Sequence, residues 1–179
     1  MNRMLRVAPL LAIAIALSAC GFHLRRNAAL PPAMSRVHLV VTGSSELQRK
    51  LSRALENAKV DVEDEPGPGI AELHVPVASF GTQSLTQGGY VRITEYAVRM
   101  HTEFNLTAGD GTILVPHQSI DMQHEYSYDS TDTVGNASEV QQLQSSLVED
   151  TVQAIMFRLE AAGRHPQVVP APASTTGKS

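Results

Sequence analysis

The feature that most constrains the fold of this chain is a long stretch of two-residue alternation between Tyr90 and Leu106. Apolar side chains occupy even positions and polar ones the odd positions from Arg99 to Asn105, the pattern of a strand with one dry face and one wet face. Asp110-Gly111, a dipeptide typical of hairpin turns, follows, and Thr112 to Tyr128 returns as a second long strand. We therefore expect an antiparallel hairpin that is covered on one face only. Its dry face comprises Tyr96, Val98, Met100, Phe104, Leu106, Ile120, Met122 and Tyr126.

Two other segments have the spacing of amphipathic helices. Ser45 with Gln48, and later Ser138 with Gln141, fit the capping-box pattern S-x-x-Q that marks helix starts. Apolar residues then recur at steps of three and four, and Gly163 is a good residue to end the second helix. The two stripes are Leu47, Leu51, Ala54, Leu55 and Ala58, and Leu143, Leu147, Val148, Thr151, Ile155 and Leu159.

Shorter segments complete the fold prediction. Arg36 to Thr42 is β-branched and reads as a first strand, and Ala71 to Val77 alternates as another, with Pro76 at an edge or a bulge. Gly81 to Gly89 has the composition of a loop or an irregular hairpin. The order β-α-β-β-β-α predicts an α+β fold, with two helices packed on one face of a four-stranded mixed sheet.

The amino terminus has the features of a secretory signal. Arg3 and Arg6 precede an apolar run from Val7 to Leu17, which is shorter than the roughly 20 residues that span a bilayer. Leu17-Ser18-Ala19-Cys20 resembles the bacterial lipobox, which implies that the Cys20 thiol carries a diacylglycerol and that cleavage precedes it. The alternative is a plain signal peptide. Because Gly21 rather than Asp follows the cysteine, lipoprotein sorting implies a lipid-anchored position in the outer membrane.

The segment after residue 19 limits what the mature protein can be. It has 160 residues, all 18 acidic residues and 12 of the 14 basic ones, for a net charge of −6. This balance argues against nucleic-acid binding, and an acylated Cys20 leaves no thiol for a disulfide. We expect a signal peptide over 1–19, a tether over 20–35, one domain over 36–163 and a disordered tail over 164–179.

No residue pattern predicts catalysis. The sequence contains no G-x-S-x-G elbow, and Gly88-Gly89 lacks the context of a phosphate-binding loop. His101 and Glu103 would share the wet face of one strand with His117 and Asp121 on the next, so a metal site there is the alternative. Exposed alternation alone produces such polar rows, and we expect no catalytic residue, no metal and no cofactor.

Four stretches resemble the LptE family of lipopolysaccharide-assembly lipoproteins. These are the opening Cys20 to Arg25, the tether Pro31 to Met34, the pair Glu95-Tyr96, and the order of elements over 36–162. The resemblance implies a non-enzymatic protein that plugs an LptD β-barrel in a 1:1 complex and takes part in lipopolysaccharide transport. A lipoprotein that binds another periplasmic ligand or an enzyme, or a metal-dependent periplasmic hydrolase, are the alternatives.

The resemblance also implies a lipopolysaccharide site near the central strands. Arg92 and Arg99 are the basic residues there, and their odd separation places them on opposite faces of a regular strand. Arg99 has a second interpretation, as a cross-strand partner of Asp121 or Glu125, so Arg92, beside the Gly88-Gly89 loop, is the first candidate for the ligand contact. The family also implies a second basic residue at the start of the last helix. This sequence does not match it, because Asn136, Ala137 and Ser138 stand there.

Replacing the anchor residue tests the signal. We expect Cys20→Ala to accumulate as an uncleaved precursor in the inner membrane, because no thiol is present to accept the acyl chains that hold the protein, at about 0.8 kcal/mol per buried methylene. Membrane fractionation and mass spectrometry of the intact protein measure this. A processed variant in the outer membrane would contradict the lipobox interpretation.

Overall fold

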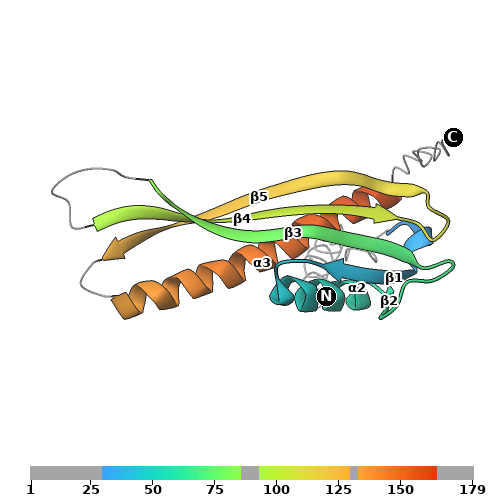
Figure 1. Ribbon diagram of the computed structural model, residues 1–179, viewed down its shortest axis with the longest axis horizontal. Helices are drawn as coiled ribbons and strands as arrows, with labels where there is room; N and C mark the ends of the chain where they lie inside the picture. The colour runs from blue at the N-terminus through green and yellow to red at the C-terminus, as the bar shows by residue number, and fades with distance from the viewer. Residues whose placement is uncertain (1–29, 86–92, 130–132, 165–179) are drawn as a thin grey trace, which may run out of the picture.

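The computed structural model describes residues 30–85, 93–129 and 133–164 (Figure 1). Over these ranges the chain has the predicted α+β fold, with two helices on one face of a mixed sheet. No helix in the described ranges is both long and apolar enough to cross a membrane. The helices are α2 (Ser45–Asn57) and α3 (Thr133–Arg164), and a short 3-10 helix, η1 (Pro32–Met34), precedes the first strand.

The sheet has five strands, one more than the sequence predicted. The additional strand, β2 (Asp61–Glu63), has three residues and pairs in parallel with β1. Three residues are too few for a recognisable alternation, which is why the sequence did not reveal it. The strand order is β2-β1-β3-β4-β5, parallel between β1 and β3 and antiparallel from β3 to β5. The other strands are β1 (Arg36–Val41), β3 (Ala71–Ser84), β4 (Ile93–Thr107) and β5 (Ile113–Asp129).

Ser44 caps α2, so the predicted capping pair that starts at Ser45 was wrong by one residue. The Ser44 hydroxyl accepts a hydrogen bond from the Leu47 amide at 3.2 Å. Just before the cap, Gly43 has a φ of +98°, and a Cβ there would lie 2.4 Å from the carbonyl oxygen of Ala78. Only glycine therefore allows the chain to turn from β1 into α2 this close to β3. The helix completely buries Leu47, Leu51 and Leu55.

β3 is longer than predicted and contains a bulge. It lies between β1 and β4, and its register with β4 shifts between His74 and Val77, so Pro76 occupies a bulge, one of the two predicted positions. The strand continues to Ser84 and pairs with β4, so of the two predictions for Gly81 to Gly89, a loop or an irregular hairpin, its first four residues fit the hairpin. Pairing with β4 overrides the loop-like composition here, and residues 86–89 of that segment lie outside the described residues.

The hairpin of β4 and β5 confirms the prediction. The two strands pair from Ile93 and Asp129 down to the turn, where the Asp110 carboxylate accepts a hydrogen bond from the Thr112 amide at 2.9 Å. Gly111 has a φ of +87°, as a tight turn requires. The even-numbered apolar positions of both strands face the helices and form the centre of the core. Those at most 3 % exposed are Val98, Met100, Phe104, Leu106 and Ile120.

α3 begins five residues before the predicted cap at Ser138 and continues through Gly163 to Arg164. Val140 and Leu143 pack against the core and extend the apolar stripe toward the helix start. With 32 residues, α3 is about 48 Å long, close to the roughly 50 Å that the 15 residues of β4 span. The helix therefore runs along the whole hairpin (Figure 1). Its buried apolar residues are Leu147, Val148, Val152, Ile155 and Leu159.

The buried stripe of α3 can be tested with one charge. Leu147 has no exposed surface, so Leu147→Asp places an unpaired carboxylate in the core and should lower the free energy of unfolding by about 4 kcal/mol or more. Gln142→Asp, on the exposed side of the same helix, is the matched control and should change it by less than about 0.5 kcal/mol. Urea unfolding of the full-length protein in detergent measures both. Equal losses would show that α3 does not pack through Leu147.

Candidate functional site

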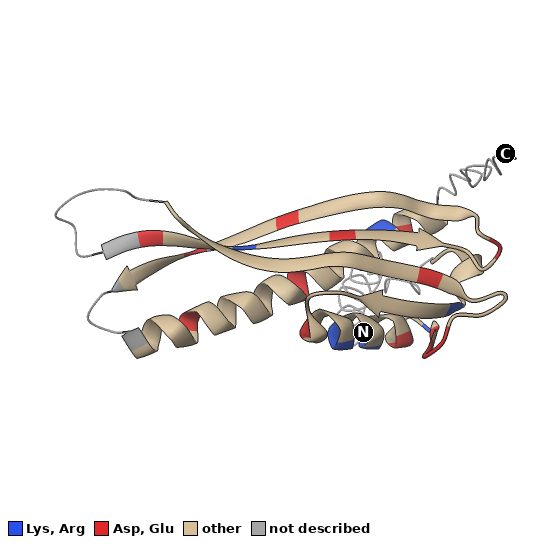
Figure 2. Ribbon diagram, in the orientation of Figure 1, with Lys and Arg blue, Asp and Glu red and all other residues tan. Residues whose placement is uncertain are grey.

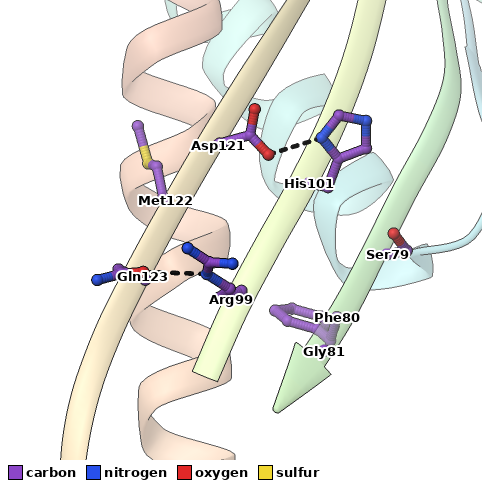
Figure 3. A pocket seen from close by; sticks show the side chains of 8 residues that line it. All are labelled: Ser79, Phe80, Gly81, Arg99, His101, Asp121, Met122 and Gln123. Atoms are coloured by element: carbon purple, nitrogen blue, oxygen red, sulfur yellow. Dashed lines mark hydrogen bonds and ion pairs between the residues drawn. The ribbon is translucent and has the colours of Figure 1, made fainter. Parts of the chain in front are cut away.

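The polar face of β3, β4 and β5 points away from the helices, and we call it the open sheet face. The strand register places Ser79, His101 and Asp121 in one row across the three strands. Gly81, Arg99 and Gln123 form the next row. A hollow of about 510 Å³ includes both rows, and Phe80 and Met122 also line it (Figure 3). This hollow is the candidate site.

His101 is the centre of a hydrogen-bonded network on the open sheet face. Its Nδ1 lies 2.8 Å from the Asp121 carboxylate, and its Nε2 lies 3.2 Å from Glu103 (Figure 3 shows the first contact). The Ser119 hydroxyl donates to the other oxygen of Asp121 at 3.2 Å, and His117 lies 3.7 Å from Glu103. Both ring nitrogens of His101 thus face carboxylates, an arrangement that a doubly protonated imidazolium satisfies.

The network changes the pKa values of its two main members in opposite directions. The hydrogen bond to Asp121, followed by the one to Glu103, raises the pKa of His101 above 6.5. The same contact with His101, supported by Ser119 and by the charge of Arg99, lowers the pKa of Asp121 below 3.8. Because the side chain of His101 is 40 % exposed and that of Asp121 75 %, the pair contributes little to the stability of the fold.

Arg99 is the only Lys or Arg in the described residues of β3, β4 and β5. Its Nε donates to the Gln123 side-chain oxygen at 3.0 Å, so its cross-strand hydrogen-bond partner is Gln123 rather than Asp121 or Glu125 (Figure 3). Arg99 is exposed and lines the hollow. An anionic group that enters the hollow can contact this side chain.

The row of Ser79, His101 and Asp121 has the residue types of a hydrolase triad but not its geometry. In a triad the second ring nitrogen of the histidine contacts the serine, whereas here it contacts Glu103. In the described part of the chain, no hydrogen bond joins Ser79 to His101. β4 lies between two strands, so the backbone amides around His101 pair with β3 and β5 and are not available for an oxyanion.

A metal site from His101, Glu103, His117 and Asp121 was the alternative for these rows. The structure brings the four side chains together through the contacts given above. Within residues 30–85, 93–129 and 133–164, however, no three His, Asp or Glu side chains are arranged to hold a metal ion. The histidine nitrogens contact carboxylate oxygens directly, as in an ion-pair network.

Of the predicted site residues, only Arg99 lies within the described residues. Cys20 and Arg92 lie outside the described residues, so the acyl anchor and the second arginine stay predictions. Ser79 and Phe80 were not anticipated, because Pro76 and Gly81 obscured the strand that carries them. The sequence offered one signal for Ser79, namely that the polar residues of β4 and β5 would have to continue onto the neighbouring strand.

The His101 network predicts a specific pH dependence. A raised pKa means that His101 stabilises the fold below pH 6.5 and loses that contribution as the pH rises through its folded value, whereas Asp121 loses its contribution as the pH falls below its lowered value. NMR titration should give a His101 pKa above 6.5 that falls in Asp121→Asn. Asp150→Asn, which affects the pair with His124 instead, is the control and should leave it unchanged. A His101 pKa of 6.5 or less in the unmodified protein would contradict the network.

Comparison with solved structures shows the fold in several bacterial lipoproteins. A minor lipoprotein from Acinetobacter baumannii matches with a TM-score of 0.63 at 19 % identity, covering 76 % of this chain and 98 % of that one. An uncharacterized lipoprotein B from Nitrosomonas europaea matches with a TM-score of 0.67 at 18 % identity, covering 81 % and 94 %. The rare lipoprotein B from Shewanella oneidensis gives 0.61 at 16 %, covering 70 % and 94 %.

The sequence itself was also compared with protein families and with curated proteins. No curated protein matches. The family model LptE, lipopolysaccharide-assembly, matches residues 34–159, which is well over half of the chain and includes every strand and both long helices up to the last turns of α3. The chain therefore belongs to the LptE family of lipopolysaccharide-assembly proteins.

Proposed function

We propose that this protein is anchored in the outer membrane through acyl chains on Cys20, plugs an LptD-like β-barrel in a 1:1 complex, and takes part in delivering lipopolysaccharide to the cell surface without catalysing a reaction. Residues 20–35 serve as the tether and 36–163 as the plug domain. Family membership supports a role in lipopolysaccharide assembly. The association with a barrel, the outer-membrane location and the ligand-contact residues go beyond family membership and belong to the proposal.

The observation that carries the proposal is the division of the sheet into a covered face and an open polar face. α2 and α3 cover the apolar face, so the opposite face presents charged and hydrogen-bonding side chains. Large outer-membrane barrels enclose a polar lumen, and a domain with a polar exterior suits it.

Arg99 is the contact that we propose for the ligand in the described part of the domain, with Arg92 as a second. Lipopolysaccharide carries phosphates, and the planar guanidinium of arginine binds a phosphate through two hydrogen bonds. Arg99 uses its Nε for Gln123, and His101 lines the same hollow in the neighbouring row. The hollow thus offers a guanidinium to a phosphate group on a polar surface.

Charge reversal at Arg99 separates lipopolysaccharide binding from association with the barrel. Arg99→Glu should weaken lipopolysaccharide binding about tenfold or more and flatten its salt dependence, because a charge-assisted hydrogen bond contributes about 1.5–3 kcal/mol. Arg53→Glu, the same change at an exposed position of α2, is the matched control and should bind as the unmodified protein does. Binding is measured with the full-length protein in detergent at two salt concentrations.

The same variants test the barrel. Both should co-purify with a large heat-modifiable β-barrel in a 1:1 ratio after detergent extraction, because neither substitution disturbs the core. Preparations of the unmodified protein that contain a small ligand and no barrel would contradict the plug role. Equal lipopolysaccharide affinities for Arg99→Glu and Arg53→Glu would remove Arg99 from the ligand site.

A further inference from the structure

A second surface lies where β5, the edge strand next to β4, runs beside α3. A hollow of about 500 Å³ separates the two elements. The half-buried Met122 forms its apolar floor beside the fully buried Leu147, and His124 Nε2 lies 3.0 Å from the Asp150 carboxylate across it. Gln123 and Gln153 complete the lining, so an apolar floor is surrounded by polar side chains. We call this surface the β5–α3 groove.

The strand beside the groove is a long open edge. β5 has 17 residues and, among the described strands, pairs only with β4. Alternate residues of an edge strand turn their N–H and C=O groups outward, where another strand can pair with them. Arg158 of α3 donates to the Ser119 carbonyl at 2.9 Å and occupies the edge at that point. The groove lies farther along β5, beyond Ser119.

The two elements that form the groove are acidic, although Lys50 of α2 and Arg99 of β4 reach its flanks, at Glu149 and Gln123. From Ile113 to Phe157 the sequence has seven acidic residues and no Lys or Arg. Figure 2 shows red segments and no blue ones along β5 and along α3 as far as its C-terminal third. Two copies of β5 paired edge to edge would bring like charges together, which is destabilising. A strand with basic side chains would instead be attracted.

We propose that the β5–α3 groove binds an extended basic segment of a partner protein, which joins the sheet as a sixth strand next to β5. Backbone hydrogen bonds to the open edge supply affinity, and alternate side chains of the segment enter the hollow over Met122 and Leu147. Lys or Arg side chains at the other positions meet Glu125 on the open sheet face, and the Asp150 carboxylate in the lining of the hollow adds to the attraction. The proposal goes beyond the proposed function, since it involves neither Arg99 nor lipopolysaccharide.

A capped nine-residue peptide that alternates valine with lysine is the probe. Fluorescence anisotropy measures its binding to the full-length protein in detergent micelles. A second peptide, with its central valine replaced by proline, has the same charge but lacks one amide hydrogen and should bind at least tenfold more weakly. The first peptide should also slow hydrogen–deuterium exchange of β5 amides between residues 120 and 128.

Charge reversal in the groove supplies the second arm of the experiment. Asp150→Lys should weaken binding about tenfold, whereas Glu56→Lys, the same change on the exposed surface of α2, should not. If Asp150→Lys lowers the melting temperature, Asp150→Asn replaces it in the experiment. The expected loss of peptide affinity is then smaller. Glu56→Lys leaves the groove intact and serves as the reference for non-specific charge effects.

Four outcomes would overturn the proposal. Equal binding of the valine and proline peptides would mean attraction by charge without strand pairing. Equal effects of Asp150→Lys and Glu56→Lys would place the peptide elsewhere, as would slowed exchange at β2 rather than β5. A dimer in sedimentation experiments that protects the same β5 amides would assign the edge to a second copy of this chain.

Discussion

The rest of the structure depends on the burial of one apolar face of a long hairpin away from water. The apolar side of β4 and β5 extends over the whole length of both strands, and only a helix of similar length can cover it. α3 does so, and at its middle the buried Thr151 hydroxyl faces the sulfurs of Met100 and Met122, at 3.4 Å and 3.9 Å. α2 then covers β1 beside it, with Lys50 joined to Ser145 of α3. The open sheet face is what remains when both helices occupy the other side.

The elements that the sequence predicted well are those with long periodic patterns. The alternation of β4 identified its buried residues, and the spacing of Leu47, Leu51 and Leu55 identified the buried side of α2. Prediction failed where tertiary contacts decide the outcome. β2 exists only because β1 offers an edge, β3 continues past Gly81 only because β4 pairs with it, and α3 starts early because the hairpin provides a surface to cover.

The candidate site was predictable in type but not in detail. The alternation placed Arg99 and His101 on the wet face correctly, and the rows containing Glu103 and Asp121 do meet. The partner of Arg99 depended on the register between β4 and β5, which irregularities near Phe104 shift, so counting along the sequence could not identify Gln123. β5 also connects the two surfaces described above, because Gln123 lines the hollow of each.

The two ends of the domain differ in thickness, and this has a consequence for its motions. β1, β2 and α2 occupy one end, while the far end consists of β3, β4, β5 and the first turns of α3 (Figure 1). Tyr96, Tyr126 and Tyr128 pack together near this thin end, with ring centroids 5.7 Å apart. Local opening requires least free energy where the fewest packed elements must separate. Fraying should therefore begin at the tyrosine end and progress toward α2, so that the thin end adapts its shape while the thick end keeps the fold.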